Sequence, residues 1–96
     1  MNVHLKLYPP LSDAAGAAEI SLEVKDEAML GDVVEALVAR FGNGMRRHLF
    51  DIEGRIIPSW AVFLNQKVVS FNQPGALNVP VKANDEVSFI LNIAGG

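Results

Sequence analysis

The order of hydrophobic patterns along the chain is the feature that most constrains its fold. Residues 3–8 and 19–24 alternate between apolar and polar side chains, as half-buried β-strands do. In residues 30–41 the apolar side chains instead recur at the spacing of an amphipathic α-helix. Strand-like segments return at 61–65, 67–70 and 86–92. The sequence therefore predicts an α+β fold with the element order β-β-α-β-β-β.

Turn-forming residues separate these segments. Pro9-Pro10 ends the first strand, because proline cannot donate to a β-ladder, and residues 11–18 are expected to form a loop. Gly42 stops the helix as a C-terminal glycine does, and a short second helix is expected at 45–50. Residues 72–84 are expected to be a long irregular connection. With the last strand placed centrally, beside the first, the fold is a β-grasp (ubiquitin-like) roll, a mixed sheet with one main helix packed across it.

Alternation within the strands predicts which apolar side chains face inward and which face outward. The inward residues of the first and last strands are Val3, Leu5, Leu7, Val87, Phe89 and Leu91, and Phe63 is also expected in the core. Tyr8 and Ile90 fall on outward positions of neighbouring strands, and Val68 is expected to join them. Contiguous exposed apolar surface commonly marks an interface. We therefore expect Tyr8, Val68 and Ile90 to form one partner-binding patch.

Composition excludes several classes of function. The chain has 96 residues, half of them hydrophobic, which suits a single domain spanning 1–96. A net charge of −3 argues against nucleic-acid binding, which needs a basic surface. The apolar runs are far shorter than the ~20 residues that span a bilayer, and no signal-peptide pattern opens the chain. Cysteine is absent, which excludes disulfides, thiolate metal sites and thiol catalysis. We expect a cytoplasmic protein with no metal site and no nucleic-acid or membrane partner.

Two glycines, Gly95 and Gly96, follow the last strand. Glycine has no Cβ, so a glycine tail can enter a channel that is too narrow for other residues. Residues 93–96, fully extended, would reach roughly 13 Å beyond the strand. We expect a flexible tail at about 93–96 whose carboxylate is presented to another protein's active site. The alternative is a chance pair of glycines at a frayed end.

Three stretches of the sequence carry a resemblance to a known family. They are LKLYPPLSDAAG at 5–16, LNQKVVSF at 64–71 and NDEVSFILNIAGG at 84–96. On these stretches the chain resembles the MoaD/ThiS family of sulfur carriers, and within it the small subunits of molybdopterin synthase (MoaD). Together with the helix at 30–41, the resemblance spans nearly the whole chain.

The resemblance implies a mechanism in which this chain has no stand-alone active site. An E1-like adenylating enzyme would use ATP to activate the carboxylate of Gly96, next to Gly95, and a persulfide sulfur donor would convert it to a thiocarboxylate. The chain would then deliver that sulfur, as small subunit or co-substrate, to the molybdopterin synthase large subunit or another sulfur-accepting enzyme. ATP would be used by the activating partner, and no cofactor would be bound permanently. The implied partner contacts are Tyr8, Val68, Ile90, Asn92, Ile93 and Ala94.

Other functions remain open at this point. One is the same carrier chemistry directed to thiamine, cysteine, thiosugar or tRNA thiolation. Another is a ubiquitin-like modifier, in which Gly96 is joined to a lysine of a target protein. A third is a β-grasp interaction domain with an inert tail. The segment at 64–71 favours a carrier of molybdenum cofactor biosynthesis over the shorter carriers of thiamine biosynthesis.

Overall fold

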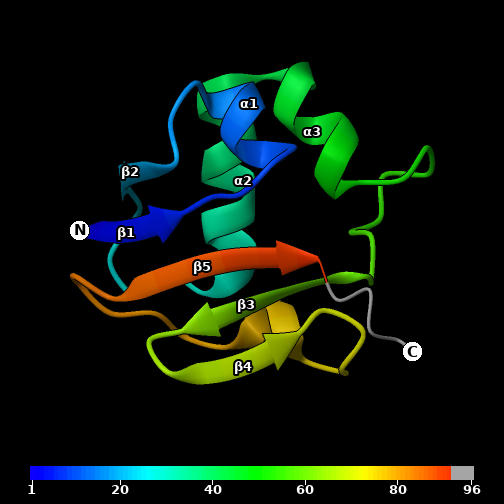
Figure 1. Ribbon diagram of the computed structural model, residues 1–96. Helices are drawn as coiled ribbons and strands as arrows, with labels where there is room; N and C mark the ends of the chain where they lie inside the picture. The colour runs from blue at the N-terminus through cyan, green and yellow to red at the C-terminus, as the bar shows by residue number, and fades with distance from the viewer. Residues whose placement is uncertain (92–96) are drawn as a thin grey trace.

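The computed structural model describes residues 1–91, so the predicted tail at 93–96 and Asn92 lie outside the described residues. Five strands form one mixed sheet in the order β2-β1-β5-β3-β4 (Figure 1). The strands are β1 (Asn2–Lys6), β2 (Glu19–Glu23), β3 (Trp60–Leu64), β4 (Lys67–Ser70) and β5 (Glu86–Leu91). The helices are α1 (Leu11–Ala15), α2 (Leu30–Phe41), α3 (Asn43–Leu49) and the 3₁₀ turn η1 (Ala76–Asn78).

The first and last described strands are neighbours at the middle of the sheet. β5 runs parallel to β1, with Leu5 opposite Val87, and antiparallel to β3, with Val62 opposite Phe89. The other pairs, β1–β2 and β3–β4, are antiparallel hairpins. The prediction of a β-grasp roll with the last strand beside the first is confirmed.

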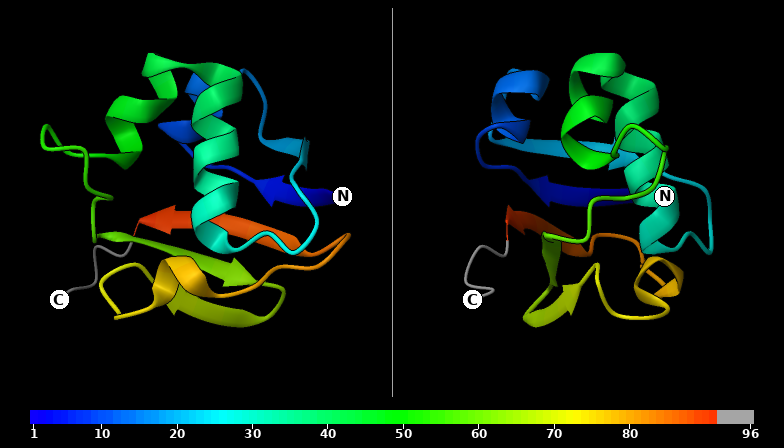
Figure 2. Two further views of the ribbon diagram at one scale, coloured as in Figure 1. Left: turned by 180° about the vertical axis from the view of Figure 1, so that it is seen from behind. Right: turned by 90° about the vertical axis from the view of Figure 1, so that its right-hand side faces the viewer.

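The helices cover one face of the sheet and leave the other face of β5, β3 and β4 uncovered. The left view of Figure 2, seen from behind, shows α2 crossing in front of the strands, with α3 beside it and η1 in front of β3 and β4. The core between these layers is built from fully buried aliphatic side chains and Phe89. Residues from both layers take part, among them Leu5, Val62, Val87, Val33 and Leu37. Because the core packs tightly against one face, the sheet holds the residues of its open face and of its strand ends in fixed positions.

Helix α2 has the bounds that its periodicity predicts, and each end has an identifiable cause. At its start the Asp32 carboxylate accepts the Met29 backbone N–H at 2.8 Å. That hydrogen bond lowers the pKa of Asp32; partial burial opposes the shift, and Lys25, 3.5 Å away, reinforces it. At its end Gly42 has φ 76°, a conformation that glycine adopts without strain.

Three sequence expectations are wrong. The segment expected to be a loop at 11–18 contains helix α1, which buries Leu11 and ends at Gly16 in the left-handed conformation. Leu91, expected in the core, is 43% exposed; it is the last residue of β5 and forms the final pair of the ladder with Trp60. Phe63, also expected in the core, faces out of the sheet.

No helix within residues 1–91 combines the length and apolar character needed to cross a membrane.

Candidate functional site

Strand β5 determines where the chain leaves the sheet. It pairs with β1 at residues 86–88 and with β3 as far as its last residue, Leu91, which lies opposite Trp60. Trp60 is buried and held in place, since its indole Nε1 donates to the His48 carbonyl at 2.7 Å. The direction of the chain at Leu91 is therefore fixed by the centre of the sheet. The predicted reactive residues Gly95 and Gly96, and the predicted contacts Asn92, Ile93 and Ala94, lie outside the described residues.

The uncovered face of the sheet carries the predicted patch residues. Directly opposite residues of paired strands share a face, so Val68 of β4, Phe63 of β3 and Ser88 of β5 form one row. In the next row, Ser70, Ala61 and Ile90 lie side by side. Val68 is 54% exposed and Ile90 is partly buried. The structure thus places Val68 and Ile90 on the same open face, with Phe63 in the row of Val68.

Tyr8 lies at the border of this face. It is 51% exposed and follows β1, whose last paired residue, Lys6, lies opposite Ser88. Tyr8 and Ile90 are each two residues beyond that pair, in two strands that run in parallel. Tyr8 therefore lies past the end of the paired strand, where its backbone carbonyl accepts the N–H groups of Leu11 and Ser12.

Phe63 is a surface residue that the sequence analysis assigned to the core. Its side chain is 39% exposed, while its neighbour Val62 is fully buried. The run Ala61-Val62-Phe63-Leu64 is apolar throughout, so alternation cannot distinguish its two faces. The signal lies in the hairpin instead: a two-residue turn at 65–66 pairs Phe63 with Val68, which was already expected to face out. We call Tyr8, Phe63, Val68 and Ile90 the open-face patch.

The same face changes character across the sheet. The outward residues of β1 and β2 are polar or charged: Asn2, His4 and Lys6 on β1, and Glu19, Ser21 and Glu23 on β2. The outward residues of β3, β4 and β5 include the apolar members of the patch. A partner that docks on this face therefore meets an apolar half beside the strand that leads toward Gly96, and a polar half away from it.

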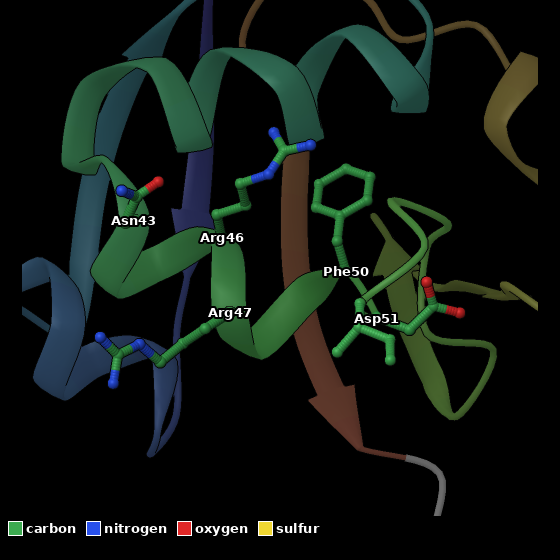
Figure 3. A pocket seen from close by; sticks show the side chains of 6 residues that line it. Asn43, Arg46, Arg47, Phe50 and Asp51 are labelled. Carbon is green, nitrogen blue, oxygen red and sulfur yellow. The ribbon is translucent and has the colours of Figure 1, made fainter.

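A hollow of about 360 Å³ lies on α3 and the turn after it (Figure 3). Arg46 and Arg47 border it, and the Arg46 guanidinium lies 4.9 Å from the centre of the Phe50 ring. Its one carboxylate, Asp51, accepts the backbone N–H groups of Glu53 and Arg55 and so belongs to the turn. The hollow presents two guanidinium groups and an aromatic ring, but within residues 1–91 it gathers no nucleophile.

Metal ligands do not cluster in the part of the chain that the structure describes: no three His, Asp or Glu side chains there lie close enough to share an ion. His4 is exposed on the open face and His48 lies on α3. The described residues thus offer an exposed apolar patch and the end of the central strand.

The sheet order, the crossing helix and the central last strand define a ubiquitin-like β-grasp protein. Its structure superposes on that of SAMP1 from Haloferax volcanii with a TM-score of 0.80, at 23% identity and with 100% of both chains covered. The putative molybdopterin converting factor subunit 1 from Pyrococcus furiosus gives 0.69 at 18% identity, covering 97% of this chain and 99% of that one. CysO in the BexX/CysO complex of Amycolatopsis orientalis gives 0.70 at 23% identity, covering 98% and 99%.

The chain belongs to the ThiS family, whose model matches residues 5–96. The resemblance to MoaD/ThiS proteins found in the sequence is thereby confirmed, and the chain is a member of a family of ubiquitin-fold sulfur carriers and modifiers. A search of curated protein sequences gives no match.

Proposed function

We propose that this protein is a sulfur carrier and that the carboxylate of Gly96 is its reacting group. The observation that carries the proposal is that the family match runs through the two glycines, which follow the central strand of the sheet. The absence of cysteine in the chain agrees with this assignment, because a carrier thiol is then not an option. The partner enzymes supply the nucleophiles and the nucleotide.

The proposed chemistry has three steps. An oxygen of the Gly96 carboxylate attacks the α-phosphorus of ATP on an E1-like enzyme, and pyrophosphate leaves. The outer sulfur of a donor persulfide then attacks the Gly96 carbonyl carbon, AMP leaves, and an acyl disulfide forms. A partner thiol attacks the donor's sulfur in that disulfide, which yields a partner disulfide and releases the thiocarboxylate. The two electrons of the last step come from the partner thiols.

The open-face patch is the proposed docking surface for these partners. A carboxylate on a slim tail reacts only when its carrier is held still against the enzyme. The patch lies on the strands around β5, so docking there would fix the origin of the tail relative to the partner's site. CysO in the BexX/CysO complex is a structural relative that is seen with a partner protein.

The proposed acceptor is the large subunit of molybdopterin synthase. Support comes from the segment at 64–71, which resembles that of molybdopterin synthase small subunits and forms the turn and strand β4 that display Val68. Asn65, at φ 58°, fixes this turn by accepting the Glu86 N–H and donating to Asp85. Calorimetry tests the assignment by comparing the affinity for that large subunit with the affinity for a sulfur acceptor of the thiamine pathway. Tighter binding to the large subunit is expected. Preference for the thiamine-pathway protein would contradict it.

The sulfur-transfer step is tested by mass spectrometry of the intact protein after incubation with ATP, the E1-like enzyme and a persulfide donor. The expected product has one oxygen of Gly96 replaced by sulfur. Oxidation of a methionine gives nearly the same mass increase, and the chain has three methionines. A thiol-directed alkylating reagent separates the two, because a cysteine-free chain is alkylated by it only at a thiocarboxylate.

The controls for this experiment are omission of ATP and a chain whose terminal carboxylate is amidated. Alkylation should disappear in both. Sulfur located elsewhere on the chain, or full loading of the amidated chain, would refute the proposal. If the protein instead becomes linked to lysines of other proteins and no thiocarboxylate is found, it is a modifier, as the SAMP1 proteins are named.

A further inference from the structure

The outer edge of β2 is the feature that the carrier function leaves unused. Backbone hydrogen bonds join Met1 to Val24 in both directions and run from the Leu7 N–H to the Ala18 carbonyl. In an antiparallel pair the hydrogen-bonded residues alternate with residues that point away. The N–H and C=O groups of Glu19, Ser21 and Glu23 therefore point away from β1, toward the edge of the sheet.

Among the described residues, one side chain donates a hydrogen bond to this edge. Arg40 of α2 donates from Nη1 to the Ser21 carbonyl at 3.0 Å, and its guanidinium also lies 5.1 Å from the centre of the Phe41 ring. The remaining outward groups of Glu19, Ser21 and Glu23 have no hydrogen-bond partner within residues 1–91. One carbonyl of the edge, that of Ser21, thus accepts a hydrogen bond from the long side chain of Arg40. The other outward groups are available to pair with a further strand.

A groove runs along this edge between β2 and α2. Its two halves, of about 590 and 510 Å³, share Glu23 and Ala36 and so form one continuous depression. On the helix side it is lined by the small side chains of Ala36 and Ala39, with Arg40 and Asp32 toward its two ends, and on the strand side by Leu22, Val24 and Lys25. An added strand would place every second side chain in this groove, over Ala36 and Ala39.

The charges along the edge determine which strand fits. The other half of the added strand's side chains would lie on the open face, beside Glu19, Ser21 and Glu23. Opposite charges on adjacent strands attract there and like charges repel. Lys6 already lies opposite Glu19, whereas Glu23 lies opposite Asn2 and has no cation across from it. A second copy of this chain would bring glutamates against glutamates in an antiparallel pairing centred on Ser21. A basic strand is therefore favoured over self-pairing.

We propose that the β2 edge binds an extended segment of a partner protein in which apolar and basic residues alternate, and that Arg40 leaves the Ser21 carbonyl when it binds. The apolar residues occupy the groove, the basic residues face Glu19 and Glu23, and the partner's backbone completes the ladder. This mode of binding is β-strand addition, in which main-chain hydrogen bonds supply affinity and alternate side chains supply selectivity.

The test uses the whole protein and a short peptide in which lysine and valine alternate, with a peptide of the same composition in blocks as the control. Amide hydrogen exchange at Glu19, Ser21 and Glu23 should be fast in the free protein and slow in the complex. Glu23→Lys should weaken binding by about tenfold, and Glu19→Lys by less, because Glu19 already faces Lys6. Glu53→Lys, which makes the same charge change on the turn after α3, should leave binding unchanged.

Arg40→Ala should strengthen binding because it frees the Ser21 carbonyl and removes a like charge. Arg46→Ala is the matched control, since Arg46 also lies over an aromatic ring but not at this edge. Equal binding of the block peptide, or slowed exchange at β4 instead of β2, would overturn the proposal. Slowing of these three amides with rising protein concentration alone would show self-pairing and would overturn it as well.

Discussion

At the scale of single residues, Phe63 shows how one position decides what the sheet displays. Its neighbour Val62 fills the core, while Phe63 itself lies on the open face between Val68 and Ser88. Partly exposed aromatic side chains contribute strongly to protein interfaces, because they bury a large area at little entropic cost. Phe63 is therefore the member of the open-face patch whose loss should matter most for docking.

Phe63→Ser is expected to weaken binding to the adenylating enzyme by about 2 kcal/mol, the size of an interface hot spot. The free energy of unfolding should change much less, because the side chain is not in the core. Calorimetric titration and denaturant unfolding measure the two quantities. His4→Ser, on the charged half of the same face, is the control. Equal losses of binding in both variants would contradict a special role for the apolar half.

Asp32 makes the stability of the protein depend on acidity. Its pKa is lowered in the folded state, mainly by the Met29 N–H, so the ionised form stabilises α2. This contribution is complete above the ordinary aspartate value of 3.8 and is lost as the pH falls through the lower folded-state pKa. Denaturant unfolding from pH 6 down to pH 2 should therefore show a smaller acid-induced loss in Asp32→Ala than in the parent. Parallel curves would show that Asp32 has no such role.

At the scale of elements, the long periodic segments could be predicted and the short or uniformly apolar ones could not. Helix α2 buries Leu30, Val33, Val34 and Leu37 at regular spacing, which is enough to set its bounds. Helix α1 has five residues and buries only Leu11, so no period is visible in it. The face of Phe63 depended on its pairing across the hairpin, and Leu91 is exposed at the last pair of its ladder, an end that alternation does not reveal.

The connection at 72–84 has a role that the sequence did not reveal. It supplies η1, which packs against the start of α2, where the Leu30 N–H donates to the Val79 carbonyl at 2.9 Å. A Cβ built on Gly31 would lie 3.2 Å from the Leu77 carbonyl oxygen, so a larger residue there would need η1 to move by a few tenths of an ångström. The connection thus holds the start of the main helix against the rest of the fold.

Gly31→Leu is expected to lower the free energy of unfolding by about 1–3 kcal/mol, as overpacking does, although leucine favours a helix. Gly44→Ala in α3 is the matched control, because nothing lies within 4 Å of a Cβ there. It should raise stability by about 0.5–1 kcal/mol through a less flexible unfolded chain. Thermal and denaturant unfolding measure both. A stabilised Gly31→Leu variant would show that η1 can move away from α2 at little cost in free energy.

At the scale of the whole molecule, the body and the proposed reacting end are separable. The sheet, the helices and the buried core are all built from residues 1–91. A family match shows that the chain is a carrier or modifier type, but the identity of the acceptor depends on surfaces of other proteins. For this reason the sequence predicts the fold and most of the candidate patch, but not the pathway that receives the sulfur under the proposed function.

Deletion of Gly96 is expected to abolish sulfur loading and to leave the melting temperature unchanged. The core residues that the structure describes run from Val3 to Phe89, and the deletion changes none of them. Adding one alanine after Gly96 should have the same effect, because it moves the carboxylate away from its two glycines. Loading is read by alkylation and stability by thermal unfolding. Normal loading of either variant would assign the chemistry to a different group.

The parallel pairing of β1 with β5 also has a consequence for synthesis. During translation β1 emerges first, but β5, the strand that fills the centre of the sheet, is made after the other four. Until residues 86–91 leave the ribosome, the two hairpins have no strand between them, and contacts of such long sequence separation form slowly. The glycines at 95 and 96 are made four and five residues after that strand ends. A nascent chain that stops before residue 86 lacks both the central strand and the glycines, so under the proposed function an activating enzyme would act only on chains that contain every strand of the sheet.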